Sequence, residues 1–104
     1  MPAISIIIRA HNDAAYLPQV LAGLRRQHRQ DFELIACDDR SSDNSAELLR
    51  SWPGVTMLPP EPNGYVPGKV LNRAVRAARG DIVVFNNADA IILDECWLEE
   101  LIAP

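Results

Sequence analysis

The sequence lacks the features that mark several large classes of protein. Only two of its 104 residues are cysteines, Cys37 and Cys96, too few for a disulfide framework or a four-cysteine metal knuckle. No apolar run approaches the roughly 20 residues that span a bilayer, and no signal peptide is visible, so a cytoplasmic location is expected. The net charge of −4 provides no basic excess to offset phosphates, so no nucleic-acid partner is expected.

Apolar residues, in contrast, make up 48% of the chain, enough for one small domain over residues 1–104 with a single core. β-branched apolar runs at 4–8, 32–37, 55–58 and 81–85 read as strands. Helix-like segments lie between them, and another follows at 94–102. This alternation predicts an α/β, Rossmann-like fold, with a mainly parallel sheet of about four strands and flanking helices.

Local signals suggest where the helices begin and which faces they bury. Asn12 or Asp13 is expected to cap a first helix, and Asn44 with Glu47 has the spacing of a capping box. The expected buried positions are Leu17, Val20, Leu21 and Leu24 in the first helix, Leu71, Ala74, Val75 and Ala78 in a helix at 68–79, and Trp97, Leu98 and Leu101 in the last. The segment 59–67, with four prolines, is expected to be a loop.

Polar clusters follow three of the expected strands. They are Arg9-Ala10-His11-Asn12, Asp38-Asp39-Arg40-Ser41 and Asn86-Asn87-Ala88-Asp89. The carboxyl ends of parallel strands share one edge of the sheet, and ligands of open α/β sheets bind at that edge. The clusters are therefore expected to converge on one binding or catalytic crevice.

Three segments together resemble the family 2 glycosyltransferases with the GT-A fold. SIIIRAHNDAAYLPQVLAGLRRQ (5–27) is similar to the opening strand and helix of that family. DFELIACDDRSSDNS (31–45) is similar to its second strand with an Asp-Asp and Ser-x-Asp turn. PGKVLNRAVRAARGDIVVFNNADA (67–90) is similar to its Gly-Lys helix and the strand that ends in Asp-x-Asp. The likeness covers nearly the whole chain.

The resemblance implies a site that binds a nucleotide-sugar, with a UDP-sugar the expected donor. Asp39 would accept a hydrogen bond from the base, Asn12 and the backbone of Arg9, Ala10 and His11 would line the pocket, and Lys69 would lie near the base or diphosphate. Asn87 and Asp89 occupy the Asp-x-Asp positions, where Asn87 would contact ribose and Asp89 would hold Mn²⁺ or Mg²⁺. Hard divalent cations of this kind take oxygen ligands and separate carboxylates from phosphates.

The chain departs from the family pattern in ways that shape these expectations. Arg9 and His11 replace the usual Pro and Tyr, and Asn87 and Ala90 replace acids, so weak metal binding is expected. The sequence corresponds to an incomplete GT-A fold that carries the donor-binding half. The base that activates the acceptor (a glycan, lipid or polysaccharide) for transfer with inversion is expected in a second half, so no catalytic residue is expected here. Family members often carry membrane segments after this region, so a membrane-associated parent is compatible with the sequence.

Other readings of the same residues remain open. Asp38 and Asp39 can cap a turn, Asp89 can cap a helix, and Lys69 can be an ordinary first-turn lysine. The alternative function is a non-catalytic remnant or assembly module that forms a homodimer through an exposed sheet edge and the last helix. A receiver-type phosphoacceptor domain is set aside, because its acidic pair should follow the first strand rather than the second.

Overall fold

A parallel four-stranded sheet organises the chain, as the sequence predicts. The computed structural model describes residues 2–60, 67–92 and 94–103, so most of the loop expected at 59–67 lies outside the described residues. The elements are β1 (Ile4–Ala10), α1 (Leu17–Arg25), β2 (Phe32–Asp38), α2 (Ser45–Arg50), β3 (Thr56–Leu58), α3 (Pro67–Ala77), β4 (Ile82–Asn87) and α4 (Trp97–Ile102). All strand pairs are parallel, in the order β3-β2-β1-β4.

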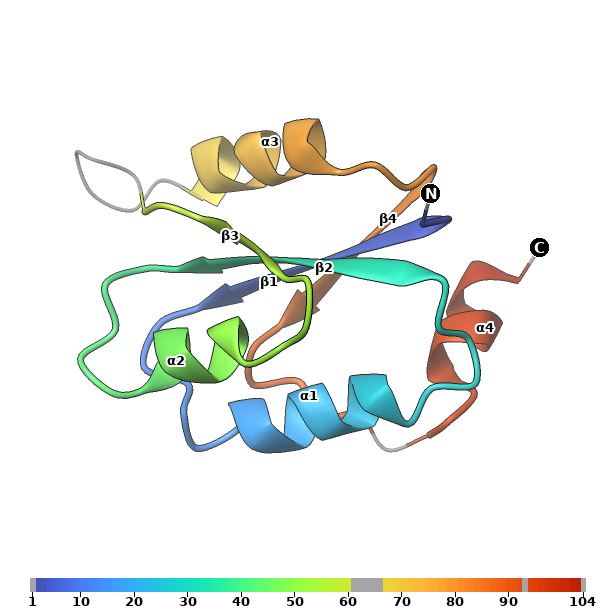
Figure 1. Ribbon diagram of the computed structural model, residues 1–104, viewed down its shortest axis with the longest axis horizontal. Helices are drawn as coiled ribbons and strands as arrows, with labels where there is room; N and C mark the ends of the chain where they lie inside the picture. The colour runs from blue at the N-terminus through green and yellow to red at the C-terminus, as the bar shows by residue number, and fades with distance from the viewer. Residues whose placement is uncertain (1, 61–66, 93, 104) are drawn as a thin grey trace.

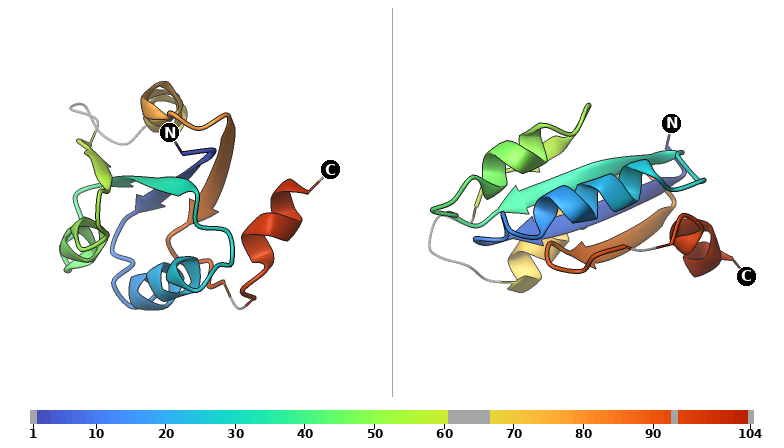
Figure 2. Two further views of the ribbon diagram at one scale, coloured as in Figure 1. Left: turned by 45° about the vertical axis from the view of Figure 1, so that its right-hand side comes forward. Right: turned by 90° about the horizontal axis from the view of Figure 1, so that it is seen from below.

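Helices cover both faces of the sheet. In Figure 1, α1 and α2 lie on one face and α3 on the other, with α4 beside the end of α1. The chain adds β2 and β3 on one side of β1, then crosses over through α3 to place β4 on the other side. The turned views of Figure 2 show the same layers. This reversal puts a topological switch point between β1 and β4, the place where open α/β sheets bind ligands.

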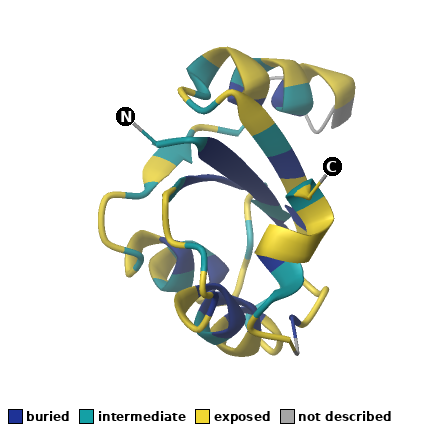
Figure 3. Ribbon diagram, turned by 90° about the vertical axis from the view of Figure 1, so that its right-hand side faces the viewer, coloured by how far each residue is buried: buried dark blue, intermediate teal, exposed yellow. Residues whose placement is uncertain are grey.

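Strand β1 is the centre of the core, because it pairs with β2 and β4 and is packed from both faces. Ile4, Ile6 and Ile8 belong to the cluster on the α1 side, whereas Ile7 packs with Ala74 of α3. Figure 3 shows β1 as the most continuously buried strand. A strand covered on both faces needs apolar residues at consecutive positions rather than alternate ones, which explains the run of isoleucines.

Helix α1 buries the four residues that its spacing predicts, but the predicted caps are wrong. Tyr16 occupies the N-cap of α1 and Asn44 that of α2, and neither cap position has a side-chain hydrogen bond. The reason is that Asn12 and Asp13 are used in contacts between loops, while the backbone N–H of Ser45 bonds to Asp43.

The predicted faces of the last two helices are partly wrong. In α3 the fully buried residues are Val70 and Ala74, spaced by one turn, whereas Val75 is 46% exposed. In α4 Leu98 is buried and Leu101 is 54% exposed. Both helices are covered by the sheet on one narrow side only, so apolar residues a quarter-turn away remain in solvent. Within the described part of the chain, no helix has the length and apolar character needed to cross a bilayer.

A buried carboxylate joins three segments at the amino edge of the sheet. Glu33 of β2 is 8% exposed and accepts hydrogen bonds from Ser5 Oγ and from the backbone N–H and Nε of Arg79. Ser5 Oγ in turn accepts the N–H of Gly80 (2.9 Å). A Cβ at Gly80 would lie 2.6 Å from the carbonyl carbon of Ile4, so only glycine allows this approach. The network holds the start of β4 against β1.

Candidate functional site

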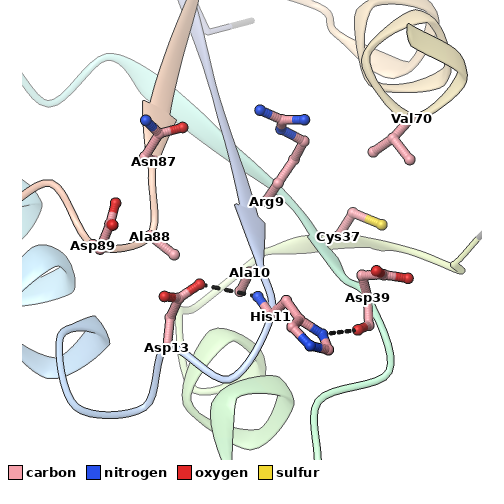
Figure 4. Close-up of a pocket in the computed structure, with 10 residues that line it drawn as sticks. All are labelled: Arg9, Ala10, His11, Asp13, Cys37, Asp39, Val70, Asn87, Ala88 and Asp89. Atoms are coloured by element: carbon pink, nitrogen blue, oxygen red, sulfur yellow. Dashed lines mark hydrogen bonds between the residues drawn. The ribbon is translucent and has the colours of Figure 1, made fainter. Parts of the chain in front are cut away.

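A cavity of about 390 Å³ opens at the carboxyl edge of the sheet. Its lining comes from the ends of β1, β2 and β4, the loops that follow them, and the first turn of α3 (Figure 4). The lining residues are Arg9, Ala10, His11, Asp13, Cys37, Asp39, Val70, Asn87, Ala88 and Asp89. The three polar clusters therefore converge at the switch point, as their positions after parallel strands predict.

Arg9 occupies the middle of this cavity because its strand is the central one. Its register partners are Cys37 on β2 and Asn87 on β4, so all three side chains lie on the α3 face of the sheet. Burial raises the pKa of the Cys37 thiol above its ordinary value, and the nearby Arg73 offsets only part of that rise. Cys37 is therefore a neutral wall of the cavity, and Arg9 supplies a positive charge at its centre.

The His11 ring is oriented by the backbone of the neighbouring loop. Nδ1 lies 2.6 Å from the carbonyl oxygen of Asp39, and a carbonyl only accepts, so Nδ1 carries the hydrogen. The other nitrogen, Nε2, lies 3.4 Å from the Asn12 side-chain amide, which can donate to it. The backbone N–H of His11 donates to Asp13 Oδ2 (3.0 Å), the second contact drawn in Figure 4.

The loop after β1 is held by side chains of the loop after β2. Three consecutive backbone N–H groups donate to these side chains: Asn12 to Ser41 Oγ (2.9 Å), Asp13 to Ser45 Oγ (2.9 Å) and Ala14 to Asp43 Oδ2 (3.1 Å). The hydroxyl of Ser45 donates to Asp43, and this bond is the main reason that the pKa of Asp43 lies below its usual range. The Ser- and Asp-rich segment 41–45 thus positions the loop that carries His11 and Asp13.

The two adjacent aspartates after β2 have different surroundings. Asp38 accepts both the backbone N–H and the hydroxyl of Ser41, so it closes the local turn. Asp39 lines the cavity with a side chain that is 21% exposed, and its Oδ1 accepts a hydrogen bond from Arg40 (3.1 Å). Arg40 has a φ of +50°, a left-handed conformation that turns the chain sharply after Asp39. Asp39 is therefore placed for a ligand, and Asp38 for structure.

The end of β4 presents an amide and a carboxylate to the cavity. Asn87 and Asp89 line it and are exposed, whereas Asn86 points to the other face and is buried. Within the described residues, the pocket carboxylates and His11 form no group of three potential metal ligands in close range. One carboxylate and one amide oxygen still fit Mg²⁺ or Mn²⁺, because such ions are commonly bound by one or two protein oxygens together with substrate phosphates.

Six of the eight predicted site residues line the cavity, and two do not. The six are Arg9, Ala10, His11, Asp39, Asn87 and Asp89. Asn12 has a φ of +53° and its Oδ1 accepts the N–H of Ser42 (2.7 Å), so it shapes the loop. Lys69 is exposed on the first turn of α3, beside the lining residue Val70.

Four lining residues escaped the sequence reasoning: Asp13, Cys37, Val70 and Ala88. Cys37 was detectable in principle, because it is the strand partner of Arg9, but only once the register of β1 and β2 is known. Val70 reaches the cavity through the placement of α3 over the sheet, for which the sequence holds no local signal.

Comparison with known proteins identifies the family. The profile of glycosyl transferase family 2 matches residues 5–104. The chain belongs to this family. The poly(ribitol-phosphate) beta-glucosyltransferase of Bacillus spizizenii is 30% identical over 101 residues, which cover 91% of this chain and 16% of that protein. An uncharacterized glycosyltransferase of Haemophilus influenzae is 32% identical over 98 residues, with 91% and 39% covered.

Solved structures of other glycosyltransferases share the fold of this family 2 chain. Residues 1–349 of TarS from Staphylococcus aureus, in complex with UDP-GlcNAc, match with a TM-score of 0.80 and 28% identity, covering 99% of this chain and 30% of that one. The mannosyltransferase PcManGT from Pyrobaculum calidifontis, in complex with GDP-Man and Mn²⁺, matches with a TM-score of 0.78 and 25% identity over 90% of this chain and 29% of that one. The chain thus spans less than two fifths of each of these four proteins.

Proposed function

We propose that the chain is the donor-binding half of an inverting glycosyltransferase whose donor is a UDP-sugar. The observation that carries the proposal is the cavity at the switch point, where Arg9 lies between Asp39 on one side and Asn87 and Asp89 on the other. A nucleoside diphosphate has a base that needs directed hydrogen bonds and a diphosphate that needs positive charge. Similarity to TarS, solved with UDP-GlcNAc, supports a uridine nucleotide as the ligand.

Each polar residue of the cavity then has a distinct part in binding. Asp39 accepts a hydrogen bond from N3–H of uracil, which distinguishes this base from one that lacks a donor there. Arg9 faces the diphosphate, and Lys69 at the start of α3 adds positive charge from the rim. His11 gives a flat surface beside the base, held in place by its bond to the Asp39 carbonyl. Asn12 acts through the loop it shapes.

Asp89, with the amide oxygen of Asn87, would hold a divalent cation against the diphosphate. Such an ion, when bound, neutralises the charge that the departing diphosphate gains. Because Asn87 contributes no charge, the protein alone offers a single anionic ligand there, and metal affinity should depend strongly on the nucleotide. The contribution of the chain is to bind and orient the donor, while the base that deprotonates the acceptor is supplied from outside residues 1–104.

Calorimetric titration of the chain with UDP, in the presence and absence of Mn²⁺, tests this proposal. We expect UDP binding that Mn²⁺ strengthens. Asp39→Asn should weaken UDP binding roughly 10- to 100-fold, the loss of one hydrogen bond to a charged group. Asp89→Asn should remove most of the Mn²⁺ dependence while leaving metal-free binding in place. Asp81→Asn, an exposed carboxylate at the opposite edge of the sheet, is the matched control and should bind like the wild type.

Other outcomes separate the parts of the proposal. GDP or dTDP in place of UDP would show whether Asp39 selects uracil, and tighter binding of GDP would overturn the assignment of the base. UDP binding that survives both Asp39→Asn and Asp89→Asn would place the nucleotide elsewhere on the protein.

A further inference from the structure

A second polar cluster lies far from the nucleotide pocket, where the end of α1 meets the start of α4. His28 Nδ1 lies 3.2 Å from Glu99 Oε1 and 3.4 Å from Cys96 Sγ. These three potential ligand atoms lie within 4.8 Å of one another, and no other such group occurs among residues 2–60, 67–92 and 94–103. Helix α1 runs antiparallel to the strands, so this cluster is at the amino edge of the sheet, opposite the cavity.

The geometry points to a zinc site formed by His28, Cys96 and Glu99. A tetrahedral Zn²⁺ with its usual bonds to nitrogen, oxygen and sulfur separates neighbouring ligand atoms by about 3.3–3.6 Å. The two printed separations, 3.2 and 3.4 Å, are close to that range without any rearrangement of the backbone. A mixed thiolate, imidazole and carboxylate set selects Zn²⁺ over Mg²⁺ or Ca²⁺, which take oxygen ligands. A water molecule would complete the four ligands.

The imidazole of His28 has the second contact expected of a metal ligand. Its other nitrogen, Nε2, lies 3.3 Å from Glu95 Oε2. Metal-bound histidines usually donate their remaining N–H to a carboxylate, which fixes the tautomer and orients the ring. An N–H on Nε2 leaves the lone pair of Nδ1 directed at Cys96 and Glu99. Glu95 is therefore a positioning residue for the proposed site.

The backbone around the cluster is fixed by a buried glutamine. Gln27, which is 4% exposed, donates to the carbonyl of Asp94 (2.7 Å) and accepts the N–H of Leu98 (2.8 Å). The backbone N–H of His28 donates to the carbonyl of Glu95 (3.0 Å). These bonds hold the end of α1 and the first turn of α4 in register, so the ligands from 28 and 96–99 are brought together before any metal binds.

Two simpler readings of the cluster account for less of it. Hydrogen bonding from Glu99 is the largest of the effects that raise the pKa of Cys96 to about 11, so the thiol is a poor nucleophile at neutral pH. An ordinary surface ion pair explains His28 with one glutamate, but not the thiol at 3.4 Å from the same nitrogen. Arg29 also lies within electrostatic range of Glu99 and competes with a cation for that carboxylate.

Cobalt titration of the metal-stripped chain tests the site, because Co²⁺ occupies zinc sites and reports its ligands optically. We expect a thiolate-to-cobalt charge-transfer band that saturates at one Co²⁺ per chain and disappears when Zn²⁺ is added. The band should be absent from Cys96→Ser and retained by Cys37→Ala, the other cysteine. Glu95→Gln should lower cobalt affinity about 10- to 100-fold, as loss of a supporting carboxylate does.

The remaining variants distinguish the cluster from other metal-binding groups. Asp89→Asn, at the nucleotide pocket, should leave the cobalt band unchanged. Zn²⁺ at a hundredfold excess over its Kd should raise the Tm of the wild type by roughly 10 °C and that of Cys96→Ser by none. No charge-transfer band in the wild type, a band that persists in Cys96→Ser, or cobalt affinity unaffected by both His28→Gln and Glu99→Gln would overturn the proposal.

Discussion

The two edges of the sheet use their carboxylates in opposite ways. At the amino edge, Glu33 is buried and both of its oxygens accept hydrogen bonds from Ser5 or Arg79. At the carboxyl edge, Asp39 and Asp89 line an open cavity. A carboxylate whose hydrogen bonds come from the protein stabilises the fold, whereas one that faces a cavity is available to a ligand. Substitutions at the two edges should therefore separate stability from binding.

The largest effect is expected for Gly80→Ala at the amino edge. The added Cβ would lie 2.6 to 2.9 Å from three backbone atoms of Ile4 and Ser5, so β1 or β4 must shift. Overpacking of this kind should lower the free energy of unfolding by about 3 kcal/mol, measured by urea denaturation. Gly68→Ala is the matched control, because nothing lies within 4 Å of its Cβ and alanine favours a helix. Equal stability of the two variants would contradict the close approach at Gly80.

Glu33→Gln should cost about 2 kcal/mol through the lost charge-assisted hydrogen bonds. Burial raises the pKa of Glu33, but hydrogen bonds from Ser5 and Arg79 outweigh that effect and the pKa is lowered overall. The stabilisation is therefore present above the unfolded pKa of about 4.3 and is lost as pH falls through the lower folded pKa. Unfolding free energies of wild type and Glu33→Gln should converge below about pH 4. A gap that persists in acid would mean that shape, not charge, decides the effect.

An intermediate effect is expected for Ser45→Ala at the carboxyl edge. The substitution removes the acceptor of the Asp13 N–H and the donor to Asp43. It should cost about 1 kcal/mol of stability and also weaken UDP binding, because the loop that carries His11 is no longer held. Ser42→Ala, an exposed neighbour, should change neither quantity by much. Loss of stability without loss of UDP affinity would uncouple this loop from the pocket.

The smallest effect is expected for Arg29→Ala on the surface. Arg29 Nε lies 2.6 Å from Asp31 Oδ1, and the hydrogen bond from Arg29 is the main reason that the pKa of Asp31 is lowered. Both side chains are in solvent, where such pairs contribute little. Thermal unfolding should shift by no more than that of Arg26→Ala, an exposed residue on the same segment. A clearly larger shift would give this pair a structural role.

Much of the fold was readable because its signals are local. The isoleucines of β1 and the spacing of Leu17, Val20, Leu21 and Leu24 report strand and helix directly. The helix caps were misjudged because the same side chains had partners in other loops, as with Asp13 and Ser45. Val75 and Leu101 were expected to be buried because apolar spacing cannot say how much of a helix its neighbours cover.

The sequence by itself determined the class of fold, the edge at which polar residues converge and, through its motifs, membership of glycosyltransferase family 2. These depend on the order of residues along the chain and on the rule that parallel strands share a carboxyl edge. Only the tertiary structure decided that Val70 and Cys37 line the cavity, that Asn12 shapes a loop instead, and that His28 meets Cys96. Those contacts join residues distant in sequence, and packing rather than local preference sets which of them meet.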